Sequence, residues 1–194
     1  MLARQYDFYT TQEYLAIEEE AKRKSEYYDG EIVALAGASL NHNRIAGNIH
    51  TALNNSVGGK PCESFIGDVK VWIEERNFFT YPDVMVVCGE TKFVESRSDT
   101  ITNPKIIIEV LSESTERYDR SAKFHAYWTL DTLEEYILVD QYRLRVEYFR
   151  RTSAKEWALR VLTNIEDVLD LTSVGVEITL SSIYRNVDWE EDEK

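Results

Sequence analysis

The run Lys105-Ile106-Ile107-Ile108-Glu109-Val110-Leu111 is almost continuously apolar, with one acid inside it. Pro104 comes directly before it and marks a break in the chain. A short run that is rich in β-branched residues is typical of a strand buried on both faces. We therefore expect a strand in the centre of the fold.

The segments around this run show helix and strand patterns in turn. Apolar residues at helical spacing predict helices over 11–23, 42–55 and 116–130, and a short helix over 180–184. Asp29-Gly30 lies between two β-prone runs and predicts a hairpin within 25–35. Further strands are expected over 63–74, 78–88, 135–140, 144–151 and 157–162. We expect 89–103 to be a loop, and the fold class to be α/β in the broad sense that includes α+β.

The composition indicates one globular domain over residues 1–194, because 43% of the residues are hydrophobic and 29% are charged. A signal-peptide pattern and an apolar run of about 18 residues are both missing from the sequence, so we expect a cytoplasmic protein that does not enter a membrane. Cys62 and Cys88 are the two cysteines, and neither is in a CxxC context. We therefore expect no disulfide or structural zinc, which fits a reducing compartment.

The formal charge of -13 argues against a protein that coats nucleic acid by bulk attraction, since such binding requires Lys and Arg at the phosphates. An acidic protein can still gather its basic residues on one face and use bound cations to cancel its carboxylates. The total charge therefore lowers the expectation of nucleic-acid binding without excluding it.

Glu109 is the most unusual residue in the predicted core. Burial of an ionised carboxylate costs several kcal/mol unless a cation or hydrogen-bond donors compensate it. Glu109 is then either half of a structural ion pair or a metal ligand. Asp83 lies at the start of the predicted strand that continues with Val84. Considered alone, it is best explained as a turn residue that binds backbone amides. Together, however, acids on two neighbouring strands supply the hard oxygen ligands that Mg²⁺ prefers.

Lys123 follows on the next predicted helix, where it could orient or deprotonate an attacking water and offset charge at a phosphate. Taken alone, it could equally be an ordinary solvated lysine. Arg117 and Arg120 are expected on the same side of this helix and could form a basic patch. Arg143 and Arg145 alternate along the next strand and either extend this patch or form a solvated face.

Other catalytic designs fit poorly. The histidines His42, His50 and His125 lack zinc-ligand spacing, although His42 at the start of its helix could support a metal ligand or simply cap the helix. The GxxxxGK, GxGxxG and GxSxG motifs are all missing from the sequence. P-loop and serine-hydrolase chemistry are therefore disfavoured.

Several short motifs, in order, resemble those of the bacterial Uma-two family of restriction-endonuclease-like proteins. The residues that carry the resemblance, which covers roughly residues 10–150, are Tyr27-Tyr28-Asp29-Gly30-Glu31-Ile32-Val33, Ala36-Gly37-Ala38-Ser39, His42, Tyr81-Pro82-Asp83-Val84, Ile108-Glu109-Val110-Leu111-Ser112, Ser114-Thr115, Asp119, Lys123, Tyr127 and Glu135-Tyr136. That family belongs to the PD-(D/E)XK nuclease superfamily. The resemblance implies a restriction-endonuclease-like core, a mixed four-stranded sheet flanked by helices.

The resemblance also implies roles for single residues. Asp83 would be the first acid and Glu109 the second, with the Val110 carbonyl as a backbone ligand for Mg²⁺, which Mn²⁺ can replace. The superfamily has lysine two positions after the second acid, where this chain has Leu111, so Lys123 would take its place. An upstream acid often completes such sites, and Glu31 is the first candidate, with Glu26 second. Contacts that support the metal or the phosphate are expected from His42, Arg120 and Tyr127.

Two functions remain open at this stage. The first is a Mg²⁺-dependent endonuclease that hydrolyses DNA phosphodiester bonds, with a homodimer expected because double-strand cutting by this fold generally uses two sites. The second is a catalytically silent domain that kept the nuclease fold and binds nucleic acid or protein. The acidic balance favours the second function. The intact set of Asp83, Glu109 and Lys123 favours the first, because a binding module has little reason to bury unpaired acids.

Overall fold

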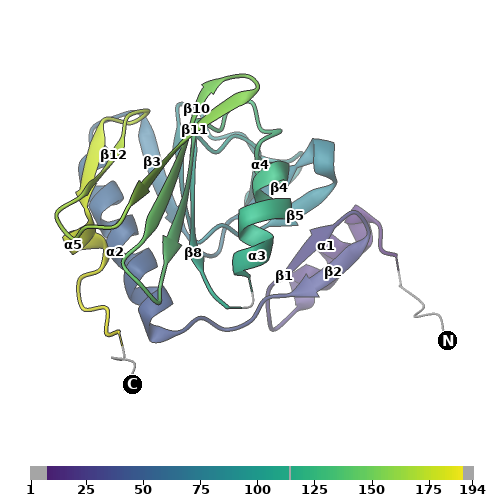
Figure 1. Ribbon diagram of the computed structural model, residues 1–194. Helices are drawn as coiled ribbons and strands as arrows, with labels where there is room; N and C mark the ends of the chain where they lie inside the picture. Colours follow the sequence, from purple (N-terminus) through teal and green to yellow (C-terminus); the bar gives the residue numbers. More distant parts are fainter. Residues whose placement is uncertain (1–7, 114, 190–194) are drawn as a thin grey trace.

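The computed structural model describes residues 8–113 and 115–189, which form two main β-sheets with helices beside them (Figure 1). The larger sheet has six strands in the order β11-β10-β9-β8-β6-β3. Within it β8 and β9 run parallel, and the other neighbours run antiparallel. Its strands are β3 Cys62–Ile66, β6 Val84–Cys88, β8 Ile106–Leu111, β9 Glu135–Asp140, β10 Val146–Ser153 and β11 Glu156–Leu162. The predicted α+β fold with a mixed sheet is confirmed.

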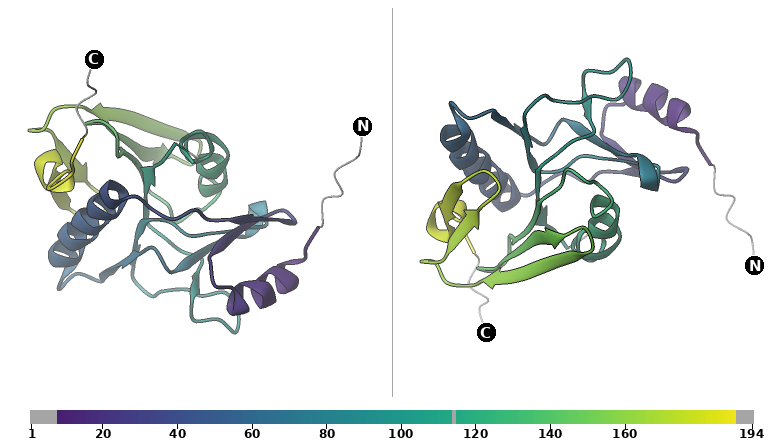
Figure 2. Two further views of the ribbon diagram at one scale, coloured as in Figure 1. Left: turned by 90° about the horizontal axis from the view of Figure 1, so that it is seen from below. Right: turned by 90° about the horizontal axis from the view of Figure 1, so that it is seen from above.

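The second sheet has five strands in the order β2-β1-β5-β4-β7. Its strands are β1 Ser25–Tyr28, β2 Glu31–Ala34, β4 Lys70–Ile73, β5 Phe78–Thr80 and β7 Thr100–Ile101. Helix α1, Thr11–Glu20, lies beside this sheet (Figure 2). Its Tyr14 stacks on Tyr27 and contacts Phe79. The hairpin expected at Asp29-Gly30 is present, with both residues at positive φ.

Strand β8 is buried on both faces, as its apolar run predicted. Ile106, Ile108 and Val110 face a core shared with helix α2, Leu40–Val57, and helix α5, Leu180–Ile183. Ile107 and Leu111 face the opposite core, which includes Phe124 and Tyr136. Because side chains alternate along a strand, Glu109 also lies on this second side. An acid thus enters an otherwise apolar layer.

The predicted helix over 116–130 is a helical run with three parts: α3 Glu116–Tyr118, a π-helical turn Asp119–Lys123 and α4 Phe124–Tyr127. Phe124 fixes it to the larger sheet by stacking on Tyr136, with ring centroids 5.0 Å apart, and by contact with Phe149 at 4.7 Å. Helix α1 ends at Glu20 instead of residue 23, while α2 is longer than predicted at both ends.

The two long strands predicted over 63–74 and 78–88 are each divided in two, because the chain crosses between the sheets. It leaves the larger sheet after β3 through Gly67, whose φ is +67°, and returns after β5 through residues 81–83, where Pro82 lacks an amide hydrogen. The loop expected over 89–103 contains the short strand β7, since Ile101 is buried.

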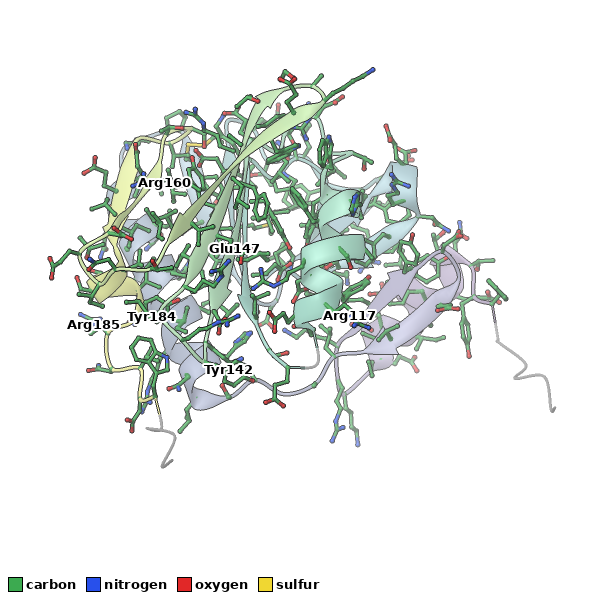
Figure 3. The ribbon with its side chains drawn as sticks, viewed as in Figure 1. Arg117, Tyr142, Glu147, Arg160, Tyr184 and Arg185 are labelled. Atoms are coloured by element: carbon green, nitrogen blue, oxygen red, sulfur yellow. A yellow bond between two sulfur atoms is a disulfide. The ribbon has the colours of Figure 1, made fainter. Side chains whose placement is uncertain are left out.

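A hairpin of β12, Val168–Leu171, and β13, Val176–Thr179, was not expected. Its buried residues alternate, so the strand signal was present but short. Beside it, Tyr184 ties the end of α5 to the larger sheet (Figure 3). Its hydroxyl lies 3.0 Å from the Asp140 carbonyl oxygen and 2.8 Å from that of Arg145.

Cys62 and Cys88 lie opposite each other on β3 and β6 and form a disulfide. The expectation of unpaired cysteines was wrong, because strand register brings together two residues whose sequence spacing carries no signal. Within the described residues, no helix combines the length and apolarity needed to cross a membrane. Ser114, which is part of the family motifs, lies outside the described residues.

Candidate active site

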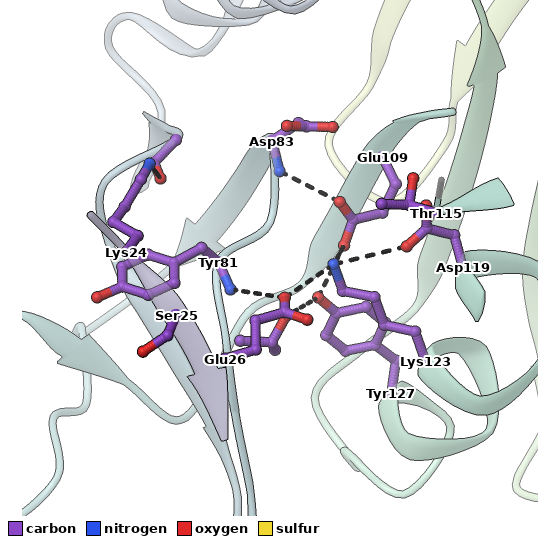
Figure 4. Close-up of polar contacts among 12 residues, drawn as sticks. Lys24, Ser25, Glu26, Tyr81, Asp83, Glu109, Thr115, Asp119, Lys123 and Tyr127 are labelled. Atoms are coloured by element: carbon purple, nitrogen blue, oxygen red, sulfur yellow. Dashed lines mark hydrogen bonds and ion pairs between the residues drawn. The ribbon is translucent and has the colours of Figure 1, made fainter. Parts of the chain in front are cut away.

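The candidate site lies where the two sheets meet the helical run 116–127 (Figure 4). Glu26 comes from β1 of the smaller sheet, and Glu109 comes from β8 of the larger sheet. Asp83 directly precedes β6, at the point where the chain returns to the larger sheet. Asp119 and Lys123 come from the π-helical turn. The site therefore needs both sheets and the helical run in place.

Lys123 occupies the centre of the buried part of this cluster. Its Nζ atom lies 3.0 Å from Glu109 Oε1, 3.1 Å from Glu26 Oε1 and 3.6 Å from Asp119 Oδ1. The lysine is 5% exposed, so water contributes little to its solvation. Burial lowers the pKa of Lys123, but the carboxylates around it outweigh this effect and hold its pKa well above the usual value. Lys123 is therefore a fixed cation in this arrangement.

Glu109 bridges the lysine and the second acid. Its Oε1 atom accepts a hydrogen bond from the Tyr127 hydroxyl at 2.8 Å, and its Oε2 atom accepts one from the Asp83 backbone N–H at 3.4 Å. Burial raises the pKa of Glu109 to about 8, and the Lys123 ammonium offsets only part of this rise. Burial likewise raises the pKa of Asp119. The cluster thus contains more acid than its one lysine neutralises.

Asp83 faces the open side, with 23% of its side chain exposed. Its Oδ2 atom accepts the Val110 backbone N–H at 2.7 Å and lies 3.1 Å from Nε2 of His42. The N–H and C=O groups of one strand residue point to the same side, so the Val110 carbonyl points to the same edge of β8 as Asp83. Asp83, Glu109 and this carbonyl can therefore all reach one point beside the cleft.

A cleft of about 560 Å³ opens at this edge, within the size range of ligand sites in proteins. Asp83, Glu109, Asp119 and Lys123 lie in its lining. Much of the opposite lining comes from the loop over 35–39, whose side chains are small apart from Leu35. An extended polar ligand can therefore approach the acids from the open side.

The donor set fits a hard divalent cation. Carboxylate and carbonyl oxygens are the ligands that Mg²⁺ prefers, and it commonly keeps several waters besides one or two carboxylates. Asp83, Glu109 and the Val110 carbonyl match this pattern with open positions left toward the cleft. Among the described residues, no group of three or more Asp, Glu, His or Cys side chains is placed so that it could hold a metal ion. The fit therefore rests on two side chains and one backbone oxygen.

The structure separates the two candidates for the upstream acid. Glu26 is 5% exposed and contacts Lys123, Thr80 and the Tyr81 amide. Glu31 is exposed beside the hairpin turn, opposite Tyr28, and is not part of the cluster. The register of the hairpin places both acids on one sheet face, but only the end of that face at Glu26 contacts the helical run. Glu26 therefore replaces Glu31 in the candidate site.

Three of the arginines considered for a basic patch, Arg120, Arg143 and Arg145, pair with acids, while Arg117 is exposed. Arg120 pairs with Glu116 at 3.0 Å and with Glu147, so its charge is neutralised away from the Lys123 cluster. Arg120 and Lys123 both lie in the π-helical turn, where the residue spacing differs from that of a regular α-helix. Arg143 and Arg145 precede β10 instead of alternating along it, and pair with Asp140 and Glu147.

His42 and Tyr127 do reach the site, through Asp83 and Glu109 respectively. Gln141 had no predicted role. It is buried beyond the end of β9, donates to the Leu111 carbonyl at 2.7 Å and pairs with Ser39, the N-cap of α2. Gln141 thus connects the start of the His42 helix to the end of the Glu109 strand. Its sequence context carried no signal, because this contact joins distant segments.

The fold and this cluster define a restriction-endonuclease-like protein. A solved structure titled "Crystal structure of a putative nuclease belonging to DUF820", from Anabaena variabilis ATCC 29413, shares the fold with a TM-score of 0.75 at 17% identity, over 91% of this chain and 97% of that chain. The family model Uma2, described as "Putative restriction endonuclease", matches residues 11–181. The chain belongs to the Uma2 family, which confirms the resemblance seen in its motifs.

Two Synechocystis proteins are similar over most of their length. Uncharacterized protein sll1609 is 42% identical over 79% of this chain and 86% of its own. Uncharacterized protein slr1290 is 34% identical over 91% of each chain. The similarity therefore extends well beyond the site motifs.

Proposed function

We propose that the protein is a metal-dependent endonuclease that hydrolyses phosphodiester bonds in DNA. The observation that carries this proposal is the placement of Asp83, Glu109 and the Val110 carbonyl at the edge of the cleft, with Lys123 directly behind them. Family membership supports nuclease chemistry, and the choice of DNA as substrate is part of the proposal.

Asp83, Glu109 and the Val110 carbonyl would hold Mg²⁺ or Mn²⁺. A divalent cation bound there supplies Lewis acidity toward a phosphoryl oxygen and lowers the pKa of a bound water. His42 and the Val110 N–H both contact Oδ2 of Asp83 and so hold its carboxylate in place. Groups that orient ligands in this way commonly change metal affinity or activity by about 10–100-fold.

Lys123 contributes a positive charge next to the reacting phosphate. The surrounding carboxylates hold its pKa high, so we assign it to stabilisation of developing negative charge instead of proton abstraction. Tyr127 and Glu26 fix the positions of Glu109 and Lys123 respectively. Thr80, on the smaller sheet, contacts both Tyr127 and Glu26. These contacts leave the ammonium little freedom to move.

Burial of three acids around one lysine also bears on the silent alternative. A protein that only binds nucleic acid or protein gains little from acids at the base of its cleft, because they repel phosphates and cost desolvation energy. A bound divalent cation reverses that repulsion. The endonuclease is therefore the better explanation of this cluster.

The test is incubation of purified protein with supercoiled plasmid and Mg²⁺ or Mn²⁺, beside Asp83→Ala. Asp68→Ala is the matched control, because Asp68 is an acid whose side chain is 89% exposed. We expect metal-dependent nicked or linear DNA from the wild type and Asp68→Ala, and none from Asp83→Ala. Parallel reactions with RNA test the choice of substrate. Binding of DNA without cleavage under any metal would instead establish the silent alternative.

A further inference from the structure

Strand β11, Glu156–Leu162, is the outer strand of the larger sheet and pairs with β10 alone among the described strands. Figure 2 shows the β10–β11 hairpin along the periphery of the molecule. Leu159 is 54% exposed and Val161 is 39% exposed. Free edges are usually protected by prolines, inward-pointing charges or bulges. The one bulge here lies at the hairpin end, and the strand contains no proline, so most of β11 can accept another strand.

The backbone directions along β11 follow from the neighbouring strands. The Arg151 N–H donates to the Glu134 carbonyl, and the Asp140 N–H donates to the Arg145 carbonyl. The backbone N–H and C=O groups of the odd-numbered residues of β10 therefore point toward β9. The backbone groups of the even-numbered residues of β10 therefore point toward β11 and form hydrogen bonds with their partners on that strand. The amides and carbonyls that point outward from β11 consequently belong to Trp157, Leu159 and Val161.

We propose that β11 pairs antiparallel with β11 of a second copy of this chain, about a two-fold axis at Ala158. In this register Trp157 of one copy and Leu159 of the other exchange backbone hydrogen bonds, because the backbone N–H and C=O groups of both residues point outward from the sheet edge. Glu156 lies opposite Arg160 of the second copy, twice by symmetry. The remaining central pair joins the two small Ala158 side chains.

Charge selects this register over its neighbours. An axis at Leu159 would place Glu156 opposite the buried Leu162 and leave both charges unpaired. An axis at Arg160 would place two arginines face to face, which is destabilising. With the axis at Ala158, opposite charges meet on one face of the sheet. On the other face Trp157 and Leu159 form an apolar row beside Phe149, the β10 partner of Leu159.

The pairing is compatible with an open site. The residues that line the cleft belong to other segments, and β9 and β10 separate β11 from the Glu109 strand. Glu156 and Arg160 are both exposed in the single chain. Their substitution should therefore leave the fold of one copy unchanged.

Sedimentation velocity of the full chain over a range of concentrations tests the interface. We expect a dimer for the wild type, and dissociation constants raised roughly tenfold or more for Glu156→Arg and for Arg160→Glu, because two attractive pairs become repulsive. The double variant Glu156→Arg/Arg160→Glu should restore dimerisation, while circular dichroism shows that all variants are folded. A monomeric wild type overturns the proposal. So does a dimer that is indifferent to the single changes, or a double variant that stays monomeric.

Discussion

Replacement of Lys123 by Met tests whether one ammonium compensates the acids of the site. Methionine keeps an unbranched side chain of similar length but removes the charge that Glu109, Glu26 and Asp119 share. Loss of one partner from a buried ion pair costs about 3–5 kcal/mol. For a protein of this length, such a loss lowers the melting temperature by roughly 6–20 °C.

The loss should depend on pH in a defined direction. The pKa of Glu109 in the folded protein, about 8, exceeds its ordinary value of 4.5, so folding favours the protonated acid. Stability from this group is present at low pH and decreases as the pH rises from about 5 to 8. Without the lysine, the acid becomes still harder to ionise. Lys123→Met should therefore be close to wild type at pH 5 and weakest at pH 9.

Urea unfolding at pH 5 and pH 9 measures the effect. Lys105→Met is the control, because Lys105 pairs with Glu134 at a partly exposed site and should cost less than about 1 kcal/mol. If Lys123→Met unfolds at the same urea concentration as the wild type at pH 9, the ammonium does not compensate these acids. The assignment of Lys123 as the central cation would then fail.

Three other predictions concern the metal and its ligands. Asp83→Ala should abolish Mn²⁺ binding in calorimetric titration, and binding equal to wild type would place the metal elsewhere. Glu109→Gln should remove metal-dependent cleavage. Because the amide does not ionise, the metal-free variant should gain stability over the wild type at pH 9, and this gain should be smaller at pH 5. A marked loss of stability at both pH values in thermal melts would show that the Lys123 ion pair is mainly structural. His42→Ala should weaken Mn²⁺ binding about 10–100-fold, and an unchanged titration would reduce His42 to a residue of the helix start.

Local patterns predicted the elements that one sheet or one helix face determines. The apolar run at Ile106–Leu111 and the helical spacing from Ile45 to Leu53 identified β8 and α2, because each depends on its own periodicity. The division of 63–74 and 78–88 was missed, since it depends on a chain that contributes to two sheets. The Cys62–Cys88 pairing was missed for a related reason, because strand register is a tertiary property.

The candidate site was predictable where burial produced an anomaly within the sequence. Glu109 stands out because its neighbours are apolar, and the structure brings Asp83 and Lys123 to it. The choice between Glu26 and Glu31 was not predictable, because alternation along a hairpin gives the face of a side chain and not which end of that face is covered. The neutralisation of Arg120 depends on Glu147, which belongs to a distant strand.

The passage of the chain from the larger sheet to the smaller one and back has a consequence for folding kinetics. Lys123 joins Glu26 of one sheet to Glu109 of the other, so neither sheet alone can assemble the site. Contacts between segments this distant in sequence are costly in loop-closure entropy and form slowly. Recovery of metal binding during refolding should therefore lag behind recovery of secondary structure. The rate of this recovery would report the rate at which the two sheets dock.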